Sequence, residues 1–158
     1  MVFQVGDKVI HKRYGLGEVI ELDEKELSGK QTHCYVVRIR DLTMWVPADD
    51  SPRSSLRSPT PSKDFDKLCA ILRSPGEPLS NDRFERKTQL YEDMKDGTLE
   101  GFCRVIRNLT LLGTSKKLNV DDRTVFERAL SFLVNEWMLS FSVSQAQAER
   151  EINQLLGV

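Results

Sequence analysis

The sequence predicts an α+β protein of two domains, a small SH3- or Tudor-like β-barrel followed by a compact bundle of about five helices. Three observations predict this class. Residues 1–58 are rich in glycine and β-branched residues, whereas residues 62–158 follow the 3.6-residue period of helices. Between them, residues 49–62 are dense in serine, proline and arginine, which is typical of a linker with little regular structure.

The first domain contains four or five predicted strands. The clearest are residues 8–11, 18–22, 32–40 and 42–46. Gly15 and Gly17 are expected to frame a tight turn into the second strand, and Pro47 closes the fourth because proline cannot continue a hydrogen-bond ladder. So few short strands are too few for a sandwich and favour a small, strongly bent barrel.

The second domain shows apolar stripes at helical spacing. The first stripe is Phe65, Leu68, Cys69 and Leu72, and it ends at Pro75-Gly76. The expected helix-capping residues are Asn81 or Asp82 for the second helix, Thr98 for the third and Ser144 for the fifth. These signals together predict the helical bundle.

Composition limits the classes of protein that fit. The net charge is −1, so any contact with nucleic acid must come from a local patch. No apolar run approaches the roughly 20 residues that span a bilayer, and the N-terminus lacks the pattern of a signal peptide. Three isolated cysteines favour reduced, buried thiols over a disulfide framework. We therefore expect a cytoplasmic protein.

The sequence contains no recognisable catalytic, metal or cofactor motif. His33 and Cys34 are adjacent on a strand and point to opposite faces, and His11 is expected to be structural or on the surface. The acidic pairs Asp49-Asp50, Glu92-Asp93 and Asp121-Asp122 are interpreted as solvated charges and helix caps. We expect no enzyme, no metal and no cofactor. The alternative is a small hydrolase or metal enzyme that uses His11, His33 and the scattered acidic residues.

Two surface clusters are candidates for binding. Three cations and an aromatic residue open the second predicted helix, at Arg83, Phe84, Arg86 and Lys87. Because a helix N-terminus disfavours cations, they indicate an anionic partner such as a phosphate backbone. The alternative is a solvated face with Phe84 in the core.

The second cluster lies on the predicted strands, where Arg38, Arg40, Met44 and Trp45 combine long cations with large apolar groups. Trp45 is either part of the barrel core or an exposed anchor in an interface. The residues alone leave both readings open.

Short motifs along the chain resemble the CarD family. In the first domain they are Gly6-Asp7-Lys8-Val9-Ile10, Tyr14-Gly15-Leu16-Gly17-Glu18-Val19, Leu27-Ser28-Gly29, Tyr35-Val36-Val37, Val46-Pro47 and Leu56-Arg57. In the second they are Leu72-Arg73-Ser74-Pro75, Lys95-Asp96-Gly97, Val105-Ile106-Arg107-Asn108-Leu109 and Glu127-Arg128-Ala129. The first set resembles the polymerase-interacting domain that this family shares with the transcription-repair coupling factor.

The resemblance implies a transcription regulator. Such proteins dock a Tudor-like barrel onto the β subunit of bacterial RNA polymerase, partly by adding a strand edge to its sheet. The helical domain then lies against promoter DNA at the upstream edge of the melted bubble and stabilises the open complex. The implied polymerase-binding residues are Lys25, Arg38, Arg40, Asp41, Thr43, Met44, Trp45 and Pro47.

The DNA side departs from the family pattern. Family members commonly place a tryptophan near the start of the second helix, where this chain has Arg83 followed by Phe84. The expected DNA-binding residues are Arg83, Phe84, Arg86, Lys87, Lys116, Lys117 and Arg123. The alternative is an adaptor that binds polymerase and has lost contact with the DNA fork. We expect a monomer without membrane contact, associated with the nucleoid through the polymerase.

Overall fold

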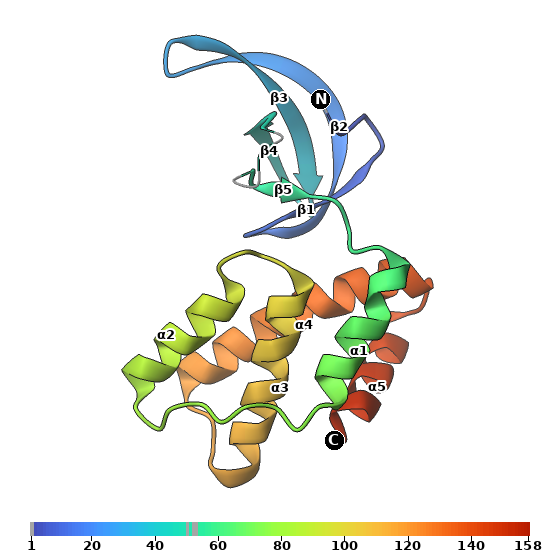
Figure 1. The fold of residues 1–158 in the computed structure, drawn as a ribbon. Coiled ribbons are helices and arrows are strands. Elements are labelled where there is room, and N and C mark those ends of the chain that lie inside the picture. Colours follow the sequence, from blue (N-terminus) through green and yellow to red (C-terminus); the bar gives the residue numbers. More distant parts are fainter. Residues whose placement is uncertain (1, 50, 52–53) are drawn as a thin grey trace. The chain divides into compact units, whose positions relative to one another are not determined.

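The computed structural model describes residues 2–49, 51 and 54–158. It divides into two compact units, Met1–Pro59 and Thr60–Val158 (Figure 1). Within these described residues, the first unit contains five strands and the second contains five α-helices. The predicted α+β class, with a β domain followed by a helical one, is therefore confirmed.

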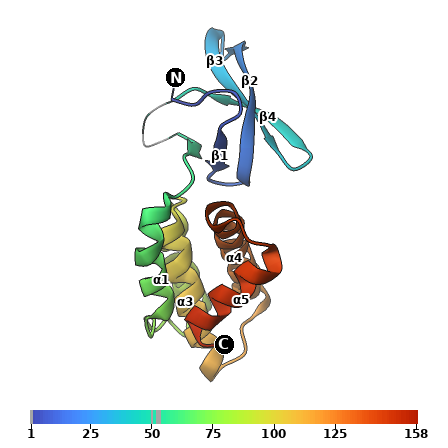
Figure 2. The ribbon, with the colours of Figure 1, turned by 90° about the vertical axis from the view of Figure 1, so that its right-hand side faces the viewer.

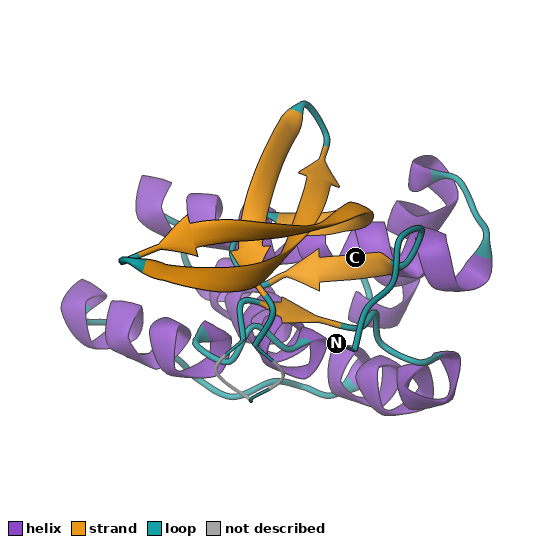
Figure 3. Ribbon diagram, turned by 90° about the horizontal axis from the view of Figure 1, so that it is seen from above, coloured by secondary structure: helices purple, strands orange, loops and turns teal. Residues whose placement is uncertain are grey.

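The five strands of the first unit form one antiparallel sheet. They are β1 Lys8–His11, β2 Gly15–Leu27, β3 Lys30–Ile39, β4 Leu42–Pro47 and β5 Leu56–Arg57. Their order in the sheet is β4-β3-β2-β1-β5, and the sheet is strongly curved (Figure 3). The register between β2 and β3 shifts at Val19/Glu21, where a β-bulge increases the local bend.

The curved sheet closes around a single hydrophobic core. Its buried members are Val9, Val19, Tyr35, Val37, Ile39, Val46 and Leu56. Val46 belongs to β4 and Leu56 to β5, so the two ends of the sheet contribute to the same core. We call this first unit the barrel.

The turn between β1 and β2 lies at residues 12–14, earlier in the chain than predicted. His11 organises it, because its Nδ1 accepts hydrogen bonds from the backbone N–H groups of Arg13 and Tyr14 at 3.1 and 3.2 Å. Burial, and the charge of Arg13, lower the pKa of His11. His11 therefore has a structural role, which is to accept the backbone hydrogen bonds of the β1–β2 turn.

Gly15 and Gly17 belong to β2 and do not form the turn that the sequence suggested. They pair with His11 and Val9 of β1. Gly17 is required by close packing, since a Cβ there would lie 2.6 Å from Cγ1 of Ile39 and 2.8 Å from the backbone oxygen of Arg38. The glycine permits close approach of two strands, a role that the sequence pattern alone does not separate from a turn.

The predicted linker contains one short strand. Leu56 and Arg57 form β5 and pair with His11 and Ile10 of β1. Burial of Leu56 in the barrel core explains why this segment is ordered among serines and prolines. Asp50, one of the expected solvated carboxylates, lies outside the described residues.

The second unit is built around one central helix. A 3₁₀ turn, Ser62–Asp64, leads into α1 Phe65–Arg73, and α2 Arg83–Met94, α3 Leu99–Ser115, α4 Val120–Phe141 and α5 Gln145–Leu156 follow. The helix α3 packs against α1, α2 and α4, and α5 covers α1 and α4 (Figures 1 and 2). The stripe on α3 that includes Phe102, Ile106 and Leu109 is buried accordingly.

The predicted caps are confirmed, and one was missed. Asp82 caps α2, Thr98 caps α3 and Ser144 caps α5, each accepting from backbone N–H groups of the first turn. The cap of α4 is Asn119, which forms a reciprocal capping box with Asp122.

The three cysteines are free thiols. Cys34 and Cys103 are buried and Cys69 is half-buried. Burial raises the pKa of Cys103 to about 12, so this thiol stays protonated and unreactive. Across the residues that the structure describes, no helix could cross a membrane and no cluster of side chains could hold a metal ion.

Candidate functional site

The barrel offers an open sheet edge at β4. One side of β4 pairs with β3 from Cys34↔Pro47 to Ile39↔Leu42. The other side pairs with no strand within the described parts of the chain, because β4 ends the sheet order. Such an edge presents backbone N–H and C=O groups to a further strand.

Five of the eight residues implied in polymerase binding share the outer face of the sheet. Directly opposed residues point to the same face, and β3 pairs Val36 with Trp45 and Arg38 with Thr43. On the other side of β3, Thr32 pairs with Lys25 of β2. The five residues on this face are Lys25, Arg38, Thr43, Trp45 and Pro47.

Trp45 is an exposed side chain and not part of the barrel core. It is 42% exposed, and its Nε1–H donates to Oδ2 of Asp23 at 3.1 Å. The ammonium of Lys25 lies 4.4 Å from the centre of the indole ring. Of the two interpretations that the sequence left open, burial in the barrel core is wrong, and Trp45 is exposed on the surface of the barrel.

The other implied residues lie elsewhere. Met44 alternates with Trp45, so it packs against the barrel core and does not join the outer face. Arg40 and Asp41 form the turn between β3 and β4, where Arg40 adopts a left-handed φ of 55°. Nη2 of Arg40 donates to the backbone oxygen of Tyr14 at 3.4 Å.

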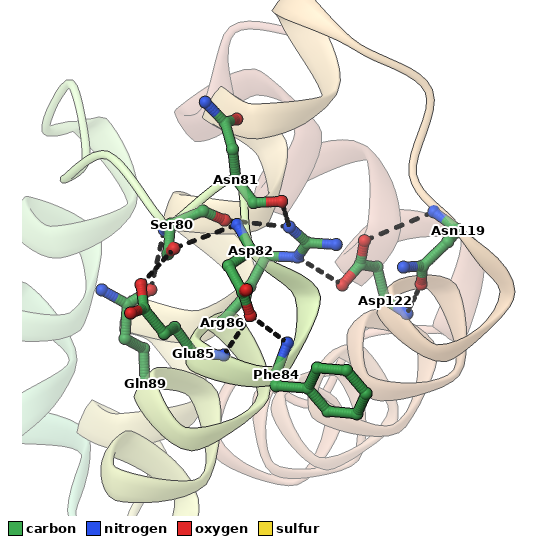
Figure 4. A network of polar contacts seen from close by, with 9 residues as sticks. All are labelled: Ser80, Asn81, Asp82, Phe84, Glu85, Arg86, Gln89, Asn119 and Asp122. Carbon is green, nitrogen blue, oxygen red and sulfur yellow. Dashed lines mark hydrogen bonds and ion pairs between the residues drawn. The ribbon is translucent and has the colours of Figure 1, made fainter.

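The helical unit presents an exposed aromatic side chain at the start of α2. Asp82 accepts from the backbone N–H groups of Phe84 and Glu85 at 2.8 and 3.0 Å (Figure 4). These two bonds, with that of Glu85 the larger effect, lower the pKa of Asp82. Phe84 is 70% exposed, and the guanidinium of Arg83 lies 5.2 Å from its ring centre. The reading that placed Phe84 in the core is wrong.

Arg86 was expected in the DNA-binding patch, and the structure corrects this. Its side chain is 3% exposed, and its Nε lies 2.9 Å from Oδ1 of Asp122. Its Nη1 donates to the backbone oxygens of Ser80 at 2.9 Å and Asn81 at 3.4 Å (Figure 4). Arg86 therefore serves the interior of the helical unit and is not available to a phosphate.

Asp122 is a helix cap as expected, but it is buried and not solvated. Its Oδ2 accepts a hydrogen bond from the backbone N–H of Asn119 at 3.3 Å, while its Oδ1 accepts one from Nε of Arg86. Asn119 in turn accepts from the N–H of Asp122 at 2.7 Å. The network joins the starts of α2 and α4. The spacing Asn119-x-x-Asp122 was the sequence signal that could have revealed it.

A hollow lies between the starts of these two helices. Arg83, Phe84 and Lys87 of α2 line it, together with Asp121 and Val125 of α4. Each helix N-terminus is already capped, by Asp82 in α2 and by the Asn119 box in α4. The caps occupy the backbone N–H groups of Phe84, Glu85 and Asp122, so fewer backbone donors are left for an incoming phosphate.

The remaining predicted DNA contacts are exposed but do not line this hollow. Lys116 and Lys117 follow the last turn of α3, and Arg123 lies on the first turn of α4. Together with Arg83 and Lys87, they are the exposed cations among the predicted DNA-binding residues.

Comparison with known proteins places both units in one family. Residues 67–153 match the model of the CarD C-terminal domain, and residues 3–58 match that of the CarD-like/TRCF RID domain. A protein of Bacillus subtilis (strain 168), described as "Putative transcription factor YdeB", is 25% identical over 152 residues. That alignment covers 92% of this chain and 97% of the relative.

The two matches follow one another along the chain and coincide with the β unit and the helical unit. The match to the CarD C-terminal domain, residues 67–153, alone spans more than half of the sequence. The chain therefore belongs to the CarD family of transcription regulators.

Proposed function

We propose that this protein regulates transcription by docking its barrel onto the β subunit of RNA polymerase and contacting promoter DNA through its helical unit. In this way it tunes the stability of the open complex. The observation that carries the proposal is the open edge of β4 beside the half-exposed Trp45, in a domain matched by the RID model.

Several features support the polymerase dock. An open edge can extend a partner's sheet through backbone hydrogen bonds, which supply affinity without depending on side chains. Trp45 adds a large, partly apolar anchor, the residue type that most often dominates interface energies. Arg38 and Arg40 supply cations beside it, on the face and at the turn.

The helical unit supports a DNA contact that does not read sequence. Phe84 projects from the start of α2 and is flanked by the cations Arg83 and Lys87. An apolar ring of this kind can wedge between base pairs at a minor groove, while cations meet the phosphates. The burial of Arg86 leaves fewer cations than the sequence suggested. The proposed contact therefore combines apolar insertion of Phe84 with phosphate contacts by the exposed cations that remain.

A second candidate is an adaptor that binds polymerase without contacting the DNA fork. Two observations favour it: Arg86 is buried, and Asp121 places a carboxylate in the hollow beside Phe84. The two candidates differ in one measurable quantity, the change that Phe84→Ala causes in the lifetime of the open complex.

The experiment is to measure the lifetime of a reconstituted promoter open complex, with and without the protein, after a competitor challenge. Under the leading proposal the protein changes the lifetime, Trp45→Ala weakens the effect by lowering occupancy, and Phe84→Ala abolishes it at saturating protein. If Phe84→Ala acts like the unsubstituted protein, the adaptor candidate is favoured. If the unsubstituted protein neither binds polymerase nor alters the lifetime, both fail.

A further inference from the structure

The side chain of Trp45 contacts residues of a strand that is not adjacent to its own strand in the sheet. Asp23 and Lys25 lie on β2 and Trp45 lies on β4, while β3 runs between these strands. Asp23 nevertheless accepts a hydrogen bond from the Trp45 indole, and Lys25 lies over the ring. The indole must therefore reach across β3 on the outer face of the sheet.

The burial of two residues of β3 supports this position of the indole. Val36 pairs with Trp45, and Cys34 pairs with Asp23. Both side chains point away from the barrel core, yet Val36 is 2% and Cys34 0% exposed. A side chain lying across the strand accounts for burial on a face that is otherwise open to solvent.

The contacts of Asp23 leave its carboxylate little freedom. Its Oδ1 accepts from the backbone N–H of Glu24 at 2.8 Å, and its Oδ2 accepts from Trp45 at 3.1 Å. With one oxygen anchored to the backbone, the other can fix the orientation of the indole. Lys25 stabilises the ring further through a cation–π contact, with its ammonium 4.4 Å from the ring centre.

We propose that Asp23, Lys25 and Trp45 form a preformed docking platform beside the β4 edge, in which Asp23 is the positioning residue for Trp45. The proposal rests on the polymerase-binding function proposed above and deepens it. Binding then uses a face of the sheet as well as its edge. The partner surface that fits is apolar where it meets the indole and acidic where it meets Lys25 and Arg38.

The physical advantage is preorganisation. An unrestrained tryptophan would lose rotamer freedom when it docks, and this loss weakens binding. Here the hydrogen bond to Asp23 and the contact with Lys25 impose that restriction in the free protein. Removing Asp23 should therefore weaken binding although Asp23 need not touch the partner.

The platform itself is tested without any partner. Trp137 is the other tryptophan and is buried, so Trp137→Phe leaves Trp45 as the sole tryptophan, which can be excited selectively over the three tyrosines. In that background Asp23→Ala should shift Trp45 emission to longer wavelength and increase acrylamide quenching. Glu26→Ala, the same charge change on the same strand, should do neither.

A second measurement does not depend on Trp137→Phe. If the indole covers Cys34, then Asp23→Ala and Trp45→Ala should both accelerate alkylation of Cys34, located by peptide mass spectrometry. Faster alkylation in both variants supports the platform. Rates equal to those of the unsubstituted protein, together with unchanged fluorescence, would overturn it.

The docking role is tested with an isolated fragment of the polymerase β subunit. Asp23→Ala should weaken binding about tenfold when Trp45 is present and have no further effect in Trp45→Ala. An equal loss in both backgrounds, or no loss in either, would overturn the positioning role. No binding by the unsubstituted protein would instead overturn the proposed function and the partner named here, whatever the fluorescence shows.

Discussion

The guanidinium of Arg86 lies 2.9 Å from the carboxylate of Asp122, and both side chains are buried between the first turns of α2 and α4. This ion pair is completed by the capping box of Asn119 and by the backbone oxygen of Ser80 (Figure 4). It fixes how the start of α2 lies against α4. The direction in which Phe84 projects is thus set by two charges that do not reach the surface.

Removal of either partner should destabilise the protein strongly. Arg86→Ala leaves a buried carboxylate without its cation, and Asp122→Ala does the converse. We expect each to cost about 3–5 kcal/mol in the free energy of unfolding, measured by chemical denaturation. Arg83→Ala, an exposed neighbour on the same turn, should change it by less than about 0.5 kcal/mol. Equal effects at Arg83 and Arg86 would contradict the buried pair.

Phe84 should matter for DNA and not for folding. Because its ring is 70% exposed, Phe84→Ala should leave the unfolding free energy nearly unchanged. Affinity for a fork-junction duplex should fall about fivefold to tenfold if the ring unstacks a base step. Tyr91→Ala, an exposed aromatic on the same helix, is the matched control and should have little effect. Fluorescence anisotropy of a labelled duplex measures the affinities of the Phe84→Ala and Tyr91→Ala variants. Equal losses of affinity in the two variants would argue against a local wedge.

Arg40 allows a binding contribution to be separated from backbone strain. Its φ of 55° is a conformation that glycine adopts more readily than arginine. Arg40→Gly should raise the thermal midpoint, or leave it unchanged, while weakening binding to the polymerase β subunit. Arg40→Ala removes the same cation but keeps the strain, so it should bind equally weakly and be less stable than Arg40→Gly. A glycine variant that binds like the unsubstituted protein would exclude the cation from the interface.

Acid should weaken the cap of α2 in a defined pH range. The backbone N–H groups of Glu85 and Phe84 hold the pKa of Asp82 below its ordinary value of 3.8. Its stabilisation is therefore complete above pH 3.8 and is lost as pH falls through the lower, folded pKa. Asp82→Ser keeps a capping oxygen that does not titrate, so its stability deficit should shrink on acidification. Thermal midpoints across this range test it, with Thr98→Ser as a control whose deficit should not depend on pH.

The fold was predictable because its signals are local. The stripe Leu99, Phe102, Ile106 predicts a helix from neighbouring residues alone, and Thr98 marks its start. The strand β5 was missed because two residues are too few to show the alternation of apolar and polar side chains that marks a strand. Its order comes from burial of Leu56 against β1, a contact with residues far away in the sequence.

The candidate site was less predictable because it depends on contacts between residues far apart in the sequence. Arg86 and Lys87 are neighbouring cations that the sequence does not distinguish, yet Arg86 is buried and Lys87 is exposed. The difference is made by Asp122, which lies 36 positions further along the chain. The exposure of Trp45 likewise depends on its register against Val36 and on Asp23 two strands away.

Docking of the barrel onto RNA polymerase is tested by the affinity of this protein for an isolated fragment of the RNA polymerase β subunit. Calorimetry would compare the unsubstituted protein with Trp45→Ala and Arg40→Glu, and with Tyr91→Ala as a control outside the barrel. We expect measurable binding that the two barrel substitutions each weaken about tenfold or more and that the control leaves unchanged. No binding by the unsubstituted protein, or binding indifferent to Trp45 and Arg40, would contradict it.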